Sequence, residues 1–265
     1  MNRIGLAIAL IAGALTAALS GLYPEIDLVI SGLFFEPTSK SFTPHLNTFI
    51  FYSRQFALCI IGVFAVQAIA TLVIKFLLPR SRSLMPGRAA MLIVVTFILG
   101  PGLVTNVLLK DHWGRPRPGE VTQFGGADHF LQWWDPGGPC KKNCSFVAGD
   151  PSAAFWTLAS AATAPLPYRP AAYAAALLFG AAVGVLRIIA GGHFFTDVMF
   201  AGIITFLVIW IVHGFIYRWR ATRSSDSAIE DAIARSGLVF HGVVAVAITA
   251  VFRITRGIGR RISGG

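Results

Sequence analysis

The stretch Arg187-Ile-Ile-Ala-Gly-Gly-His-Phe-Phe-Thr-Asp197 lies between two long apolar segments. Charged side chains and histidine are costly to place at the rim of a membrane span, so they indicate a functional site. If the chain is helical from His193 onward, His193 and Asp197 lie four residues apart on one face, where a carboxylate can hold an imidazole in one tautomer. The stretch therefore predicts a histidine prepared to act as a nucleophile or base. The alternative is a buried structural histidine with its aspartate partner.

The apolar composition places the whole chain in a membrane. Hydrophobic residues make up 55% of 265 residues, and charged residues only 13%, against about 25% in soluble domains. The formal net charge is +10, but the basic residues are scattered between apolar runs and gathered near the C-terminus instead of forming one stripe. We therefore expect a membrane surface or an anionic lipid as partner, and no nucleic acid.

Six apolar segments predict an all-α fold, a polytopic membrane helix bundle with six transmembrane helices. They cover residues 4–22, 56–78, 91–109, 151–164, 171–189 and 194–217. We interpret the first as an uncleaved span, because the apolar region of a signal peptide is usually shorter. The fourth is short and rich in Ala and Ser, so we expect it to pack inside the bundle. Gly100-Pro101-Gly102 predicts a kink or tight packing in the third.

The basic residues between the spans set the orientation. With six spans, four groups fall on one side of the membrane: Arg3, the Arg80–Arg88 loop, Arg169 and the Arg218–Arg223 cluster. The positive-inside rule makes that side cytoplasmic. The loop 110–150 and the turn 187–193 then lie together on the opposite face. Their own basic residues break the charge rule there, as an anion-binding site would.

The chain divides into residues 1–219, which hold the spans, and residues 220–265, a predicted basic cytoplasmic tail. Within the tail, residues 238–252 are apolar but too few to cross a bilayer comfortably, and four arginines follow them: Arg253, Arg256, Arg260 and Arg261. This pattern favours an amphipathic helix on anionic lipid over a seventh span.

Two further pieces of sequence carry candidate site residues. Lys110-Asp-His-Trp-Gly-Arg-Pro-Arg117-Pro follows the third span, and a lysine point charge with an arginine fork suits a phosphoryl group. Read alone, such a cluster is otherwise a snorkelling anchor. In Gly149-Asp150-Pro151 we expect Asp150 to be the N-cap of the fourth span. Gly149 would let an anion approach the free N–H groups there.

The loop that joins these two pieces contains a pair of cysteines, Cys140 and Cys144. They either form a disulfide in an oxidising compartment or remain free thiols.

Taken together, the three pieces resemble the signature of the type 2 phosphatidic acid phosphatase family, membrane-embedded lipid phosphate phosphatases related to vanadium haloperoxidases. The matching pieces are Lys110-x6-Arg117-Pro118, a segment with Gly149 at a helix start, and Arg187-x5-His193-x3-Asp197. The resemblance covers residues from about 56 to 217, including the six-span layout.

The resemblance implies a metal-independent hydrolase without a cofactor. Lys110, Arg117 and Arg187 would hold the phosphate, and His193 would attack phosphorus to give a phosphohistidine that water hydrolyses. Asp197 would orient His193. These roles agree with the physics of phosphoryl transfer, in which cations neutralise the equatorial oxygens while the nucleophile attacks in line.

The middle piece departs from the family pattern Pro-Ser-Gly-His. This chain has Val147-Ala148-Gly149-Asp150, so Asp150 stands where the family has the histidine that protonates the leaving oxygen. A protonated Asp150 would still serve as general acid. Burial favours protonation because it raises a carboxyl pKa, whereas the nearby cations lower that pKa. Asp150 is otherwise only a helix cap. His112 or His129 is an alternative proton donor, and both are otherwise ordinary loop residues.

The function implied by the resemblance is removal of phosphate from a lipid by the domain 1–219. The lipid would be of the lipid A, polyprenyl pyrophosphate or phospholipid type, and the active site would face the periplasm from a bacterial inner membrane. Two alternatives stay open: a lipid phosphotransferase with the same intermediate, and a catalytically silent phospholipid-binding relative.

Overall fold

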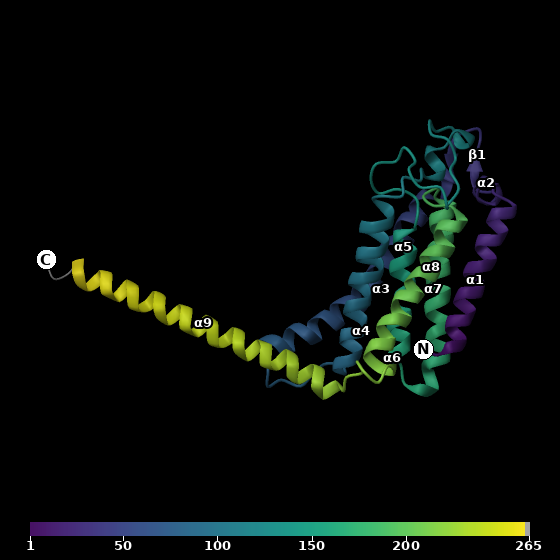
Figure 1. Ribbon diagram of the computed structural model, residues 1–265. Coiled ribbons are helices and arrows are strands. Elements are labelled where there is room, and N and C mark those ends of the chain that lie inside the picture. Colours follow the sequence, from purple (N-terminus) through teal and green to yellow (C-terminus); the bar gives the residue numbers. More distant parts are fainter. Residues whose placement is uncertain (263–265) are drawn as a thin grey trace. The chain divides into compact units, whose positions relative to one another are not determined.

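The computed structural model describes residues 1–262, with side chains up to Thr249, and is almost entirely helical (Figure 1). The elements are α1 (Arg3–Leu22), α2 (Ile26–Gly32), β1 (Phe35–Glu36), β2 (Ser41–Phe42), η1 (Pro44–Leu46), α3 (Asn47–Leu77), α4 (Gly87–Phe97), η2 (Ile98–Lys110), η3 (Pro118–Glu120), η4 (Thr122–Phe124), α5 (Gly149–Phe155), α6 (Leu158–Thr163), η5 (Leu166–Tyr168), α7 (Arg169–Ile189), α8 (Phe195–His213), η6 (Gly214–Arg218) and α9 (Asp226–Ile262). The two short strands pair antiparallel, with Phe35 opposite Phe42.

The chain forms two compact units. The first unit contains Met1–Val66 and Leu92–Arg223, and the second contains Gln67–Met91 and the chain from Ser224 onward. In the second unit, the start of α9 is tied to the start of α4, because Asp226 accepts hydrogen bonds from the backbone and guanidinium of Arg88.

Six helical segments are long and apolar enough to cross a membrane, so the predicted all-α, six-span membrane protein is confirmed. They are Arg3–Leu22, Pro44–Leu77, Gly87–Lys110, Leu166–Ile189, Phe195–Arg218 and Asp226–Thr249. The set differs from the predicted one in a single member. Residues 151–164 are absent from it, and Asp226–Thr249 takes the sixth place.

The two differences have local causes. The expected fourth span is interrupted at Trp156 and Thr157, where the Thr157 hydroxyl donates to the carbonyl of Ala154 and the indole of Trp156 donates to Ile93. In the tail, the apolar run 238–252 extends a helix that already starts at Asp226. The side chains of the four terminal arginines lie outside the described residues. The division at residue 219 therefore stays a prediction.

In the first unit, α5 and α6 are packed between longer helices, as the sequence predicts for a short segment rich in small residues. Helix α5 contacts α7, α8 and η2, and α1 contacts α8 (Figure 1). Phe155 of α5 fits against Gly180 of α7 and Gly202 of α8, where a Cβ at Gly202 would lie 3.0 Å from the ring. Small residues thus allow three helices to approach closely.

The predicted irregularity in the third span is also present. The α-helical pattern of α4 changes at Ile98 to the wider π pattern of η2, three residues before Pro101. Proline lacks an N–H and crowds the preceding turn, so an altered hydrogen-bond pattern is expected there. Thr105, which precedes Lys110 in η2, begins a chain of hydroxyl groups. The Thr105 hydroxyl lies 2.9 Å from that of Ser152, and the Ser152 hydroxyl lies 2.8 Å from that of Thr205, so the chain links η2, α5 and α8.

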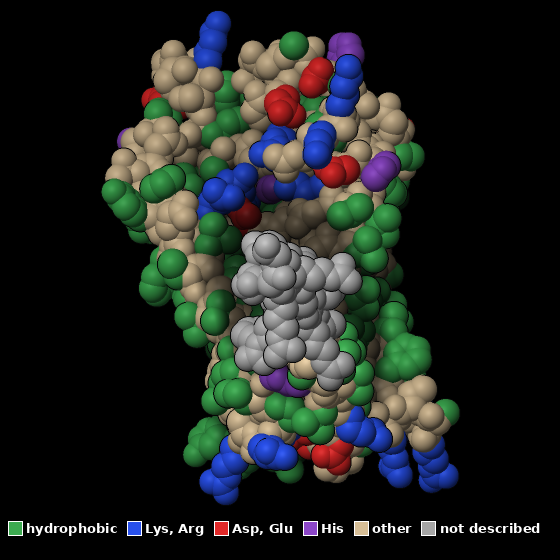
Figure 2. Space-filling model, turned by 90° about the vertical axis from the view of Figure 1, so that its left-hand side faces the viewer, with side chains coloured by type: hydrophobic (Ala, Val, Ile, Leu, Met, Phe, Trp, Pro, Cys, Tyr) green, Lys and Arg blue, Asp and Glu red, His purple; other side chains and the backbone are tan. Residues whose placement is uncertain are grey.

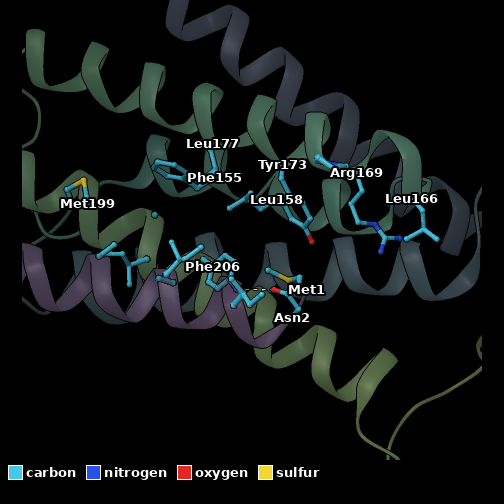
Figure 3. A pocket seen from close by; sticks show the side chains of 18 residues that line it. Met1, Asn2, Phe155, Leu158, Leu166, Arg169, Tyr173, Leu177, Met199 and Phe206 are labelled. Atoms are coloured by element: carbon cyan, nitrogen blue, oxygen red, sulfur yellow. Dashed lines mark hydrogen bonds between the residues drawn. The ribbon is translucent and has the colours of Figure 1, made fainter.

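A cavity of about 920 Å³ lies between α1, α6, α7 and α8 (Figure 3). Its lining is mainly apolar, with Arg169, Tyr173 and Asn2 toward one end and Met199 toward the other. Its described lining includes none of the predicted site residues. The cavity is therefore separate from the candidate site.

Candidate active site

Backbone hydrogen bonds bring the three predicted pieces of sequence together. The amide of Cys144 donates to Lys110 at 2.9 Å, that of Ala148 donates to Asp197 at 3.2 Å, and that of Gly119 donates to Gly191 at 3.2 Å. Figure 2 shows one face of the molecule. In its upper part, Lys and Arg side chains lie around a hollow, with acidic and histidine side chains among them. The predicted convergence on one end of the bundle is therefore what the geometry shows.

His193 lies in the turn before α8, since this helix begins only at Phe195. Its side chain is buried, and its Nδ1 donates a hydrogen bond to the carbonyl oxygen of Ser145 at 2.8 Å. A carbonyl only accepts, so the proton is on Nδ1 and the lone pair of Nε2 is available. Burial lowers the pKa of His193 well below its usual value, and the charges of Arg187, Lys110 and Arg117 lower it further, against the effect of the Ser145 bond. His193 is thus neutral at pH 7, as a nitrogen nucleophile must be.

Asp197 does not contact His193 in the expected way. Its Oδ2 is 3.9 Å from Nδ1 of His193, too far for a hydrogen bond. It accepts instead from the hydroxyl of Ser145 at 2.6 Å and from the amide of Phe194 at 2.8 Å. The expected direct contact required a helix from His193 onward, and the helix starts two residues later. Ser145 therefore stands between the carboxylate and the imidazole.

Arg115, two residues before Arg117, is fully buried and is paired with carboxylates. Its guanidinium is paired with Asp197 and, at 2.7 Å, with Asp27. Asp27 also accepts from the amide and the hydroxyl of Thr196. This network fixes the start of α8 to α2. Sequence reasoning missed Asp27, although an aspartate in the short apolar segment 26–32 was a signal that could have found it.

The charges of the three predicted phosphate-binding cations all act on His193. Lys110 ends η2, and a Cβ at Gly149 would lie 3.3 Å from its Nζ. Arg187 lies against Gly192, where a Cβ would be 2.5 Å from the guanidinium. Arg117 donates to the carbonyl of Asn143 at 2.7 Å, and its charge acts on His193 together with those of the other two.

Asp150 has a different environment from the one expected. The N-cap of α5 is Ala148, and Asp150 lies in the first helical turn. Its carboxylate is paired with Arg54 at 2.6 Å and with Arg187 at 3.5 Å. Burial raises the pKa of Asp150, but the hydrogen bond from Arg54 and the charges of Arg187, Arg54 and Lys110 outweigh it, so the pKa lies below its ordinary value. An ionised carboxylate has no proton to donate, which is opposite to the requirement for a general acid.

Sequence reasoning also missed Arg54. An arginine inside the long apolar helix α3 (Asn47–Leu77) was the available signal. The two loop histidines considered as proton donors are both exposed, and His112 bonds to the carbonyl of Val107. Cys140 and Cys144 form a disulfide, the first of the two alternatives for this pair. Among the described residues, no group of three or more His, Cys, Asp or Glu side chains could hold a metal ion.

The sequence is similar to known proteins. Residues 89–222 match the PAP2 superfamily. The chain is 34% identical over 198 residues to the lipid A 4'-phosphatase of Francisella tularensis subsp. novicida (strain U112), which covers 74% of this chain and 89% of that protein. It is 38% identical over 104 residues to the lipid A 4'-phosphatase of Rhizobium leguminosarum, covering 39% of this chain and 45% of that protein. No solved structure matches the chain.

The matched region contains all the residues that the sequence predicts for the site, from Lys110 to Asp197. The described helices make the chain a multi-pass membrane protein. It therefore belongs to the PAP2 superfamily and is a membrane phosphatase of that family.

Proposed function

We propose that this chain hydrolyses a phosphate monoester or pyrophosphate of a lipid, of the lipid A type, through a phosphohistidine at His193. The observation that carries the proposal is the state of His193. It is buried and neutral, its Nδ1 is bound to Ser145, and the charges of three cations act on it. Among the described residues, its Nε2 has no hydrogen-bond partner. The lipid A 4'-phosphatases among its relatives support lipid A as the substrate.

The chemistry divides between the cations and the imidazole. Lys110, Arg117 and Arg187 bind the phosphoryl oxygens and neutralise the charge that spreads over them as the transferred group becomes planar. Nε2 of His193 attacks phosphorus in line with the leaving oxygen. Water then attacks the phosphohistidine and releases inorganic phosphate.

Ser145 and Asp197 position the nucleophile. Ser145 holds Nδ1 of His193 through its carbonyl and is itself held by the carboxylate through its hydroxyl at 2.6 Å. As His193 attacks, positive charge develops on the ring, and the carbonyl dipole and buried carboxylate favour it. Asp197 therefore acts through Ser145.

The active site faces the periplasm of a bacterial inner membrane in this proposal. In the first unit, the charge of Arg3 acts on Arg218, and the charges of Arg218 and Arg169 both act on His213. The three arginines therefore lie at the same end of the bundle. The site loops lie at the end of the bundle opposite the N-terminus (Figure 1). The positive-inside rule assigns the Arg3, Arg169 and Arg218 end to the cytoplasm.

The test is phosphate release by purified protein in detergent with chelator, from lipid A, a polyprenyl pyrophosphate and phosphatidic acid. We expect release from lipid A, and its loss in His193→Ala. Phosphate release from only one of the other two substrates would replace lipid A by that lipid as the proposed substrate class. Transfer to a second lipid without release to water would replace the hydrolase by a phosphotransferase.

A further inference from the structure

We propose that Arg54, held by Asp150, is a specificity-determining residue that binds the leaving oxygen of the lipid substrate. The inference rests on the proposed function and deepens it. It assigns a role to an arginine that lies outside all three sequence pieces. It also explains how the chain works with an ionised carboxylate at position 150.

Arg54 and Asp150 form a two-point pair at the edge of the phosphate-binding cations. Nε of Arg54 donates to Asp150 at 2.6 Å and NH2 at 3.4 Å. Within the described part of the chain, NH1 of Arg54 is not used in that pair, and the side chain keeps 40% of its accessible surface. Asp150 is also 3.5 Å from Arg187, so it fixes Arg54 beside a phosphate-binding cation.

An apolar groove lies between the two helices that carry Arg54 and Arg187, and it indicates which part of the substrate Arg54 meets. The groove has a volume of about 450 Å³ and lies between α3 and α7. Its lining includes Ser53, next to Arg54, and Leu186, next to Arg187, and continues along both helices through Phe56 and Val183. The apolar part of a phosphorylated lipid matches such a groove. With its phosphate on Arg187, the oxygen that joins phosphate to lipid lies beside Arg54.

The leaving oxygen needs a donor, and the residues around it restrict the choice. His193 is the nucleophile and Asp150 is ionised. As the bond between phosphorus and Nε2 of His193 forms, the bond between phosphorus and the lipid oxygen breaks, and its electron pair stays on that oxygen. Arg54 stabilises the oxygen by a charge-assisted hydrogen bond, and water gives it a proton. The hydroxide so formed attacks phosphorus, breaks the phosphorus–nitrogen bond and restores neutral His193.

The experiment compares two substrates that differ only in the leaving oxygen. One is a long-chain alkyl phosphate, and the other is a nitrophenyl phosphate that carries the same chain and needs little stabilisation of its departing oxygen. For Arg54→Gln we expect kcat/KM to fall about 100-fold with the alkyl ester, the effect of removing one preorganised donor, and less than about 5-fold with the aryl ester. Arg54→Lys should restore part of the alkyl ester rate.

Arg117→Gln is the matched control, since a phosphate-binding arginine serves both esters and its loss should lower both rates alike. Equal losses of both esters in Arg54→Gln would overturn the inference, because they would make Arg54 another phosphate-binding or structural residue. The double variant Arg54→Gln with Asp150→His should regain the alkyl ester rate with an added basic limb in its pH profile, as an imidazolium can donate the proton. If the wild type released phosphate from neither ester and not from lipid A either, the proposed function would fail and this inference with it. Loss of both rates in His193→Ala together with equal losses in Arg54→Gln would leave the proposed function intact and remove only the role of Arg54.

Discussion

Gly192 offers a way to displace Arg187 without removing it. A Cβ at this position would lie 2.5 Å from NH2 and 2.9 Å from Cζ of Arg187. Carbon contacts are most favourable at about 3.5–4.0 Å, so Gly192→Ala requires the guanidinium to move by about 1 Å. The guanidinium is the far end of a flexible side chain, and we therefore expect the protein to remain folded.

A displacement of this size at a phosphate-binding group costs about 100-fold in rate, equivalent to about 2.7 kcal/mol of transition-state stabilisation. The assay is kcat/KM for phosphate release from lipid A. Gly62→Ala is the matched control, because among the described residues nothing lies within 4 Å of the added carbon. It should keep the wild-type rate.

A double variant separates displacement of Arg187 from a general disturbance. Once Arg187→Gln has removed the guanidinium, adding Gly192→Ala should cost little more, because the two changes act on one interaction. Wild-type kcat/KM in Gly192→Ala would contradict the predicted displacement of Arg187, and so would fully additive losses in the double variant.

Three further predictions concern the residues that hold the nucleophile. The pKa of His193 is lowered well below its usual value, so the neutral imidazole persists on acidification. The acid limb of the pH profile of kcat/KM should therefore follow the second ionisation of the substrate phosphate, at a pKa of about 6. An acid limb above 6.5, the ordinary pKa of histidine, would contradict this. Ser145→Ala should lower kcat about 10-fold with little change in KM, because it removes the hydroxyl through which Asp197 holds Ser145, whose carbonyl positions His193. An effect on KM alone would speak against a positioning role. Arg115→Gln should destabilise the protein by about 3–5 kcal/mol, because it leaves Asp27 and Asp197 buried without their cation. Thermal unfolding in detergent measures this loss, and an unchanged Tm would show that the network is dispensable.

The sequence was sufficient to predict the helical membrane fold and the convergence of Lys110, Arg117, Arg187 and His193. Apolar length and motif spacing are local properties, and they survive in the structure because each motif lies at the end of a helix. Gly149 lies beside Lys110 for the same reason.

The parts that could not be predicted depend on tertiary contacts. Asp27, Arg54 and Ser145 each act through a partner far away in the chain, such as the 2.6 Å contact between Arg54 and Asp150. One sequence without its fold cannot pair such residues. It likewise could not show that α8 begins two residues after His193, a small shift that moves Asp197 out of direct contact.

Two of the predicted helix boundaries were wrong for a related reason. The run 151–164 has span-like composition, but buried side-chain bonds at Trp156 and Thr157 accompany its division into two short helices. In the tail, polar residues 226–237 precede the apolar run. Hydropathy alone could not show that they continue the same helix as α9.

The proposed mechanism depends on a covalent bond between Nε2 of His193 and phosphorus. The most direct measurement is rapid acid-free quenching of the enzyme during turnover of lipid A carrying radiolabelled phosphate, followed by peptide mapping. We expect an acid-labile, alkali-stable label on the peptide that contains His193, absent from His193→Ala. Turnover without any label on that peptide, together with inversion of configuration at a chiral phosphorus, would contradict it.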